Sequence, residues 1–199
     1  MSIVKSNNKQ KRGLYLERFA QLAKMGILVA HADDLARLWQ IDDAHNLHMT
    51  LKRYADRGLL MRIYRGLYAL KPLEQLDPSQ VGLKALHRYA YISTETILVV
   101  AGILQQHVMQ ITMVSDVSRK FSIGSMDFLS RKLADRFLYN ETGVMTEGMV
   151  RRASVERAVA DMLYFNPKAY FDGAQLIDWK KVRKIQQSVD YPLTLERYL

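Results

Sequence analysis

Residues 54–70, YADRGLLMRIYRGLYAL, form a short apolar stretch interrupted by two glycines and three arginines. Two strand-like runs, Leu59–Tyr64 and Leu67–Leu70, flank the dipeptide Arg65-Gly66, which is typical of a β-hairpin turn. An isolated two-stranded hairpin is only marginally stable in water, so we expect its apolar side to pack on neighbouring helices. The residues at the outward-facing tip would then be Arg62, Tyr64 and Arg65.

The sequence before this hairpin predicts three helices in a recognisable order. Apolar residues recur at helical spacing from Leu14 until Gly26, and after the strand-like residues 27–29 the segment Ala32–Trp39 predicts a short second helix. A break at residues 40–42 separates it from a third helix, Asp43–Arg57, whose apolar stripe is Leu47, Leu51 and Tyr54. This is the order of a helix-turn-helix motif, and the following hairpin makes it a winged helix.

The third predicted helix has a polar face opposite its apolar stripe, made of His45, Asn46, His48, Met49, Lys52 and Arg53. In helix-turn-helix proteins such a face enters the DNA major groove, where Asn pairs with adenine and Arg or Lys with guanine. The N-terminus of the helix also favours phosphate oxygens. We therefore predict a DNA-binding site made of this face and the hairpin tip. The alternative is an ordinary solvated helix beside a plain hairpin with solvated arginines.

The positive charge of the chain is concentrated in its first third. The net charge is +9, and residues 1–75 contribute thirteen Lys and Arg against seven Asp and Glu, a net of +6. Residues 1–12 are polar and basic and predict a disordered arm. A local excess of this kind attracts polyanions such as nucleic acids, although a solvated basic face would give the same count.

The remaining sequence predicts a second domain of mixed structure. Pro72 and Pro78 indicate a linker over residues 71–80. The segments with helical patterns are Val81–Tyr89, Tyr91–Leu104 capped by Ser93, a helix capped by Ser154 that runs to Phe165, and Asp178–Ser188. The strand-like segments are Gln110–Val117, Lys120–Ile123 and Ser125–Leu133, which predict a meander, and Phe137–Glu141 and Thr146–Arg152. We predict an α+β protein with a winged helix-turn-helix domain over residues 1–75 and a mixed α/β C-terminal domain over residues 81–199.

Composition limits the chemistry and the compartment. The absence of cysteine excludes disulfides, thiolate catalysis and cysteine-ligated zinc, and it fits a reducing cytoplasm. The longest apolar run, Ile97–Leu104, is far shorter than the roughly 20 residues that span a bilayer. Charged residues interrupt the segment after the basic N-terminus, unlike the core of a signal peptide. We expect a cytoplasmic protein without membrane association.

No catalytic or metal-binding motif stands out. His45 and His48 are three residues apart and could share a metal ion, but the sequence offers no suitably spaced third ligand, so we expect no metal site. The polar residues from which a hydrolase or nuclease site could be assembled are Ser93, Glu95, Asp116, Asp127, Glu156 and Asp161. None of them lies in a known catalytic motif or phosphate-binding loop. We expect neither enzymatic activity nor a cofactor.

Four segments resemble the AbiEi family of antitoxins, which belong to type IV toxin–antitoxin and abortive-infection systems. These segments are RGLLMRIYRGLYAL at Arg57–Leu70, YISTETILVVAGIL at Tyr91–Leu104, ITMVSD at Ile111–Asp116 and RRASVERAVADMLYF at Arg151–Phe165. They follow the order found in the family and are spread over most of the chain. The arginine-glycine wing followed by the Tyr-Ile-Ser segment and the Ala-Ser-x-Glu-Arg-Ala helix is more specific than a winged helix alone.

The resemblance implies a DNA-binding autorepressor that binds inverted repeats in its own promoter. It also implies a C-terminal domain that counteracts a nucleotidyltransferase-like toxin, with or without direct contact between the two proteins, as part of phage defence. The family's DNA-binding role would fall on the third helix and the wing. Two alternatives remain open at this point: a winged-helix transcription factor whose C-terminal domain senses a ligand or dimerises without any toxin, and a DNA nuclease.

Overall fold

The chain is an α+β protein, and its computed structural model describes residues 15–105 and 109–194. It forms two compact units, Met1–Asp77 and Pro78–Leu199. The predicted arm at residues 1–12 lies outside the described residues.

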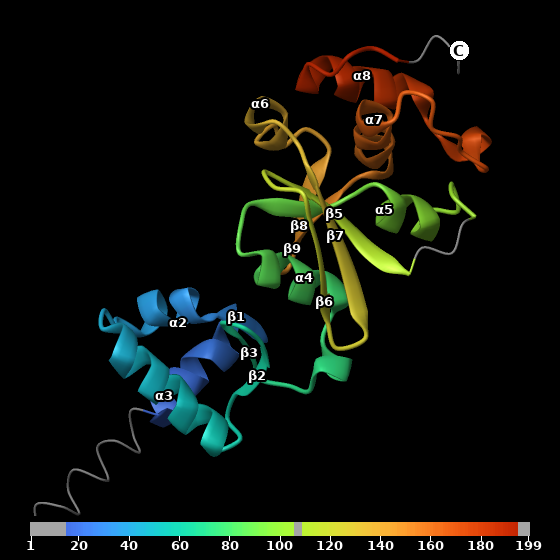
Figure 1. The fold of residues 1–199 in the computed structure, drawn as a ribbon. Coiled ribbons are helices and arrows are strands. Elements are labelled where there is room, and N and C mark those ends of the chain that lie inside the picture. The colour runs from blue at the N-terminus through green and yellow to red at the C-terminus, as the bar shows by residue number, and fades with distance from the viewer. Residues whose placement is uncertain (1–14, 106–108, 195–199) are drawn as a thin grey trace, which may run out of the picture. The chain divides into compact units, whose positions relative to one another are not determined.

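The first unit has the element order of a winged helix (Figure 1). Residues 15–24 are helical, and the elements that follow are β1 (Val29–His31), α2 (Ala32–Trp39), α3 (Ala44–Asp56), β2 (Met61–Tyr64), β3 (Leu67–Ala69) and the 3-10 turn η1 (Leu73–Gln75). The three strands form an antiparallel sheet in the order β1-β3-β2. The predicted helices at Ala32–Trp39 and Asp43–Arg57 and the predicted hairpin are therefore confirmed.

Local residues account for the position of α2 and α3. The side chain of His31 caps α2, and Gln40 ends it in the left-handed conformation at φ 53°. Asp43 then caps α3 by accepting a hydrogen bond from the backbone N–H of Asn46. Inside the unit, Trp39 stacks on Tyr54 with ring centroids 5.1 Å apart, which fixes the end of α2 against α3.

The second unit is built on a six-stranded mixed sheet with the strand order β6-β7-β5-β4-β9-β8. Its strands are β4 (Ala90–Ile92), β5 (Gln110–Ser115), β6 (Arg119–Ile123), β7 (Met126–Lys132), β8 (Val144–Glu147) and β9 (Val150–Ala153). Its helices are α4 (Pro78–Leu86), α5 (Glu95–Val100), α6 (Asp135–Leu138), α7 (Val155–Phe165) and α8 (Trp179–Val189), with a 3-10 turn η2 (Ala174–Leu176). Two neighbouring strand pairs, β4–β9 and β5–β7, are parallel, and the other pairs are antiparallel.

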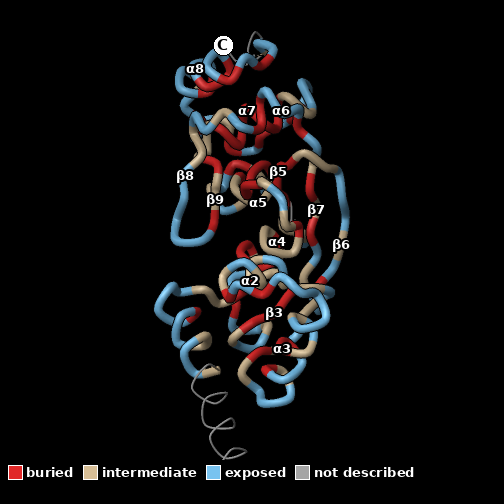
Figure 2. Tube along the Cα trace, turned by 90° about the vertical axis from the view of Figure 1, so that its left-hand side faces the viewer, coloured by how far each residue is buried: buried red, intermediate tan, exposed pale blue. Residues whose placement is uncertain are grey.

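The sheet has helices on both faces. Tyr91 and Val114, which are paired across β4 and β5, belong to one core with buried residues of α5, α6, α7 and α8. On the other face α4 lies so close that a Cβ at Gly82 would be 2.5 Å from the ring of Phe128. Figure 2 shows that α7 is largely buried, whereas α8 has an exposed outer side. The sheet is the middle layer of this unit.

Several predictions for the elements of this unit are wrong. The helix expected over Tyr91–Leu104 is shorter, because β4 occupies Ala90–Ile92 and α5 begins at Glu95. The meander does not form, since β5 pairs in parallel with β7, and β6 lies on the far side of β7. Phe137–Glu141 is not a strand, because Phe137 and Leu138 belong to α6 and are buried in the core. The single strand expected at Thr146–Arg152 is also wrong, because a turn at residues 148–149 divides this segment between the antiparallel strands β8 and β9.

Candidate nucleic-acid interface

The outward face of α3 is set by the residues that the helix buries. Thr50, Leu51 and Tyr54 are buried, so the side chains on the opposite side of the helix face away from the core. Five of the six predicted base-reading residues are exposed, namely His45, Asn46, His48, Lys52 and Arg53, and Met49 is half-buried. The structure therefore places the predicted set on one side of α3.

The N-terminus of α3 is occupied by its own cap. The backbone N–H of Asn46, one of the donors that a phosphate would use, is already bonded to the carboxylate of Asp43. The expectation that this helix terminus favours phosphate is therefore weakened, because the Asp43 carboxylate both uses the donor and adds negative charge. The side-chain amide of Asn46 makes one weak contact, in which its Oδ1 accepts from Thr50 at 3.5 Å. Its amide nitrogen remains available to a base.

The hairpin formed by β2 and β3 ends in a turn at Arg65-Gly66. Gly66 has φ +70°, and an added Cβ would lie 2.9 Å from Nε2 of His31, so both its conformation and its surroundings favour glycine. The carbonyl of Gly66 accepts from the backbone N–H of Ala32 at 2.7 Å. This bond ties the wing tip to the first residue of α2.

The wing residues differ in exposure. Arg62 and Arg65 are exposed, whereas Tyr64 is half-buried. The register of the hairpin shifts between Arg62 and Tyr64, so the strand is irregular just before the tip. The expectation that all three side chains point freely outward holds for the two arginines and only in part for Tyr64.

Among the described residues, the lysine and arginines of this surface have no acidic partner. Within residues 15–105 and 109–194, none of Lys52, Arg53, Arg62 and Arg65 forms an ion pair. In the second unit several arginines are paired, for example Arg88 with Asp116 at 2.5 Å. The arginines and lysine of α3 and the wing are thus free to contact phosphates or base edges.

Apart from Ser93 and Asp161, which are bonded to each other, the polar residues considered for catalysis lie in separate contacts. Glu95 pairs with Arg131, Asp116 pairs with Arg88, and Asp127 accepts a hydrogen bond from Ser122. Ser154 caps α7, as predicted, whereas Ser93 does not cap α5. Ser93 instead donates to Asp161 at 2.7 Å.

Asp161 is the centre of a buried hydrogen-bond network that the sequence analysis did not anticipate. One carboxylate oxygen accepts from the Nε of Arg157 and from the hydroxyl of Tyr191, and the other accepts from Tyr91 and Ser93. Arg157 also donates to the backbone carbonyls of residues 137, 140 and 142. Burial and the Asp161 charge raise the pKa of Tyr91 and of Tyr191, so both phenols stay protonated and donate. Both oxygens of Asp161 accept two hydrogen bonds each, so the network stabilises the fold and leaves no group free for catalysis.

Comparison with known proteins finds similarity at the level of structure and none at the level of sequence. No protein-family model matches the chain, and no curated protein matches it. The fold is similar to that of the RV2827C protein from Mycobacterium tuberculosis, with a TM-score of 0.47 and 11% sequence identity over 86% of this chain and 71% of that one. A similarity of this extent carries no information about function. In the part of the chain that the structure describes, no helix has the length and apolarity needed to cross a membrane.

Proposed function

We propose that this protein binds double-stranded DNA through α3 and the wing. The observation that carries the proposal is the joint exposure of Asn46, Lys52 and Arg53 on α3 and of Arg62 and Arg65 on the wing. Amide and guanidinium groups on a helix face can read base edges, and a basic wing tip can contact the phosphate backbone. His45, His48, Met49 and Tyr64 complete the proposed surface.

We further propose that the protein represses its own operon and acts as a type IV antitoxin against a nucleotidyltransferase-like toxin. The sequence resemblance to AbiEi antitoxins supports this role. Three of the resembling segments also meet in the second unit, where Tyr91 and Ser93 from the first, and Arg157 and Asp161 from the last, share one hydrogen-bond network. The middle segment forms β5, which pairs with β4. The segments that carry the resemblance are thus in contact with one another in the fold.

The DNA-binding proposal is tested by fluorescence anisotropy with the full chain on DNA from upstream of its own gene and on a scrambled duplex, at several salt concentrations. A specific repressor should prefer the upstream fragment by roughly 10³-fold or more. Equal, steeply salt-dependent binding to both duplexes would show that the surface binds polyanions in general and would refute sequence-specific repression.

The antitoxin proposal needs a separate experiment. Co-expression with a nucleotidyltransferase-like protein encoded beside the gene should restore growth to cells that the second protein alone inhibits. A chain carrying Arg62→Ala and Arg65→Ala should lose repression and still restore growth, because both substitutions lie outside the second unit. Failure of the unaltered chain to restore growth would refute the antitoxin role and leave a winged-helix transcription factor.

A further inference from the structure

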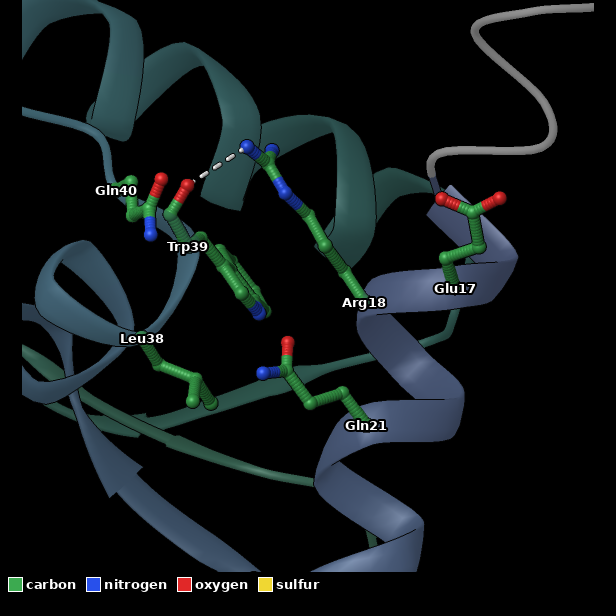
Figure 3. Close-up of a pocket in the computed structure, with 6 residues that line it drawn as sticks. All are labelled: Glu17, Arg18, Gln21, Leu38, Trp39 and Gln40. Atoms are coloured by element: carbon green, nitrogen blue, oxygen red, sulfur yellow. Dashed lines mark hydrogen bonds between the residues drawn. The ribbon is translucent and has the colours of Figure 1, made fainter.

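A pocket of about 400 Å³ lies in the first unit, between helical residues 15–24 and the end of α2 (Figure 3). Its lining residues are Glu17, Arg18, Gln21, Leu38, Trp39 and Gln40. None of them belongs to the proposed DNA-binding surface. Pockets of about this volume are large enough for small-molecule ligands. Most of the lining is polar, which favours a ligand with a polar or charged group.

The indole of Trp39 is the buried wall of this pocket. Trp39 is 5% exposed, and its Nε1 is buried without a hydrogen-bond partner among the described residues. An indole N–H can only donate, and a buried donor that lacks an acceptor is unfavourable. The ring cannot easily turn to find another partner, because it stacks on Tyr54. No described residue places an acceptor within hydrogen-bond distance of the Trp39 N–H, so this donor is available to an acceptor on a ligand.

Arg18 brings a positive charge to the same pocket. One terminal nitrogen of its guanidinium donates to the backbone carbonyl of Trp39 at 3.1 Å, and the guanidinium carbon lies 5.4 Å from the centroid of the Trp39 ring. No carboxylate is paired with Arg18 within the described parts of the chain. Figure 3 shows the carboxylate of Glu17 on the far side of Arg18 from Trp39. The pocket thus combines an indole N–H with the further donors of an arginine.

We propose that the pocket binds a small organic carboxylate. Its carboxylate oxygens accept hydrogen bonds from the guanidinium of Arg18 and from the indole N–H of Trp39, a donor pair that suits a planar, charged acceptor. The body of the ligand lies against Leu38 and the edge of the indole, which are the apolar parts of the lining. Gln21 and Gln40 are exposed residues of the lining, and the amide of Gln21 points toward the Trp39 indole (Figure 3).

Occupation of this pocket should influence α3. Trp39 stacks on Tyr54 of α3, and Gln40 is the left-handed residue that ends α2. A ligand that shifts Arg18 and Trp39 therefore acts on the turn that orients α3. This regulatory consequence rests on the proposed DNA binding, whereas the binding of the ligand itself does not.

The test uses NMR of the ¹⁵N-labelled full chain and follows the indole N–H resonances of the two tryptophans. Trp179→Phe assigns the Trp39 signal by removing the other one. The probes are benzoate, its neutral analogue benzyl alcohol, and inorganic phosphate. Benzoate should shift the Trp39 resonance in a saturable way, and the other two should not. An equal response to benzyl alcohol would refute the need for a carboxylate, an equal response to phosphate would refute the organic ligand, and no response to any probe would refute the pocket.

Variants identify the contacts. Arg18→Gln should weaken benzoate binding about tenfold or more, as expected for the loss of a charge-assisted hydrogen bond. Arg37→Gln makes the same charge change on an exposed residue of α2 outside the pocket and should leave binding unchanged. Because Arg18 also holds Trp39, Trp39→Phe provides a second test, in which calorimetry should detect weaker binding although the aromatic stack remains. Unchanged binding in folded Arg18→Gln and Trp39→Phe chains would overturn the assignment.

The regulatory consequence is measured by anisotropy on the upstream DNA with and without benzoate. A change in affinity for the unaltered chain that is lost in Trp39→Phe supports coupling between pocket and α3. Benzoate binding seen by NMR, together with no specific DNA binding, would refute the proposed function and leave the ligand site intact. Specific DNA binding without any NMR response would refute the ligand site and support the proposed function.

Discussion

Removing one hydroxyl from the network around Asp161 should lower the stability of the second unit by a predictable amount. Tyr191 is 4% exposed, and its hydroxyl donates to Asp161 at 2.7 Å. In Tyr191→Phe the ring keeps its stacking on Tyr164, with centroids 4.8 Å apart, so the change is confined to the hydrogen bond. A hydrogen bond to a charged group contributes about 1.5–3 kcal/mol, and we expect a loss of free energy of unfolding in that range.

The loss of stability in Tyr191→Phe is limited because Asp161 keeps its other hydrogen-bond donors. Its carboxylate still accepts from Arg157, Tyr91 and Ser93, so the charge stays compensated. Arg157→Met removes the buried cation itself and leaves Asp161 without a counter-charge. That variant should lose more, about 3–5 kcal/mol, as is usual when one partner of a buried ion pair is removed.

Urea unfolding monitored by the fluorescence of Trp179 measures both losses in the unit that contains the network. A Trp39→Phe background removes the signal of the first unit. Tyr191→Phe should lower the unfolding midpoint with an unchanged m-value. Tyr170→Phe is the matched control, because Tyr170 is 77% exposed and its substitution should stay within about 0.5 kcal/mol of the parent chain. A Tyr191→Phe chain that behaves like the Tyr170 control would refute the structural role of this hydroxyl.

Three further predictions concern the first unit. Arg65→Ala should weaken binding to all DNA sequences and reduce the slope of log affinity against log salt by about one unit, and an unchanged slope in anisotropy titrations would place the wing off the phosphate backbone. Asn46→Ala should lower the preference for the upstream DNA by about 1–3 kcal/mol, and an equal loss on scrambled DNA would exclude a base-reading role. Burial raises the pKa of Tyr54 to about 12, against the lowering effect of Arg18. The pKa of an unfolded tyrosine is about 10, so the folded state holds the phenol proton more tightly than the unfolded state does. The stability that protonated Tyr54 contributes is therefore fully present below pH 10 and is lost as the pH rises towards 12. Tyr54→Phe should therefore reduce the alkaline loss of stability of this unit by about 2 kcal/mol, measured by urea unfolding at pH 9 and pH 11.5; an unchanged pH dependence would show that another group titrates.

The winged-helix elements could be predicted from the sequence because local residues determine them. Gln40, Gly58 and Gly66 all have positive φ and mark the ends of α2, α3 and the wing strand β2. The apolar stripe of α3 also follows helical spacing over several turns. Each of these signals lies within a few residues of the feature that it predicts.

The second unit was harder to predict because distant residues decide its structure. Ser93 and Ser154 have the same Ser-x-Glu pattern, yet only Ser154 is a helix cap. Ser93 bonds to Asp161, which is 68 positions away, and no local rule anticipates that partner. Likewise, β5 pairs with β7 rather than with β6, the strand that follows it in the sequence. This strand order depends on the complete sheet and has no local sequence signal. The pocket beside Trp39 was missed for the same reason, since Arg18 and Trp39 are 21 positions apart.

The network around Asp161 also has a consequence for synthesis on the ribosome. Domains fold largely as units, N-terminal first, while the chain is being made. The first unit ends at Asp77, so its helices and wing can close early, whereas Asp161 gains its last hydroxyl only after Tyr191 has been added. A nascent chain that has passed Asp77 but not reached Tyr191 would therefore already carry the whole surface that we propose binds DNA. Ribosome stalling between these two points would separate the two proposed activities in time.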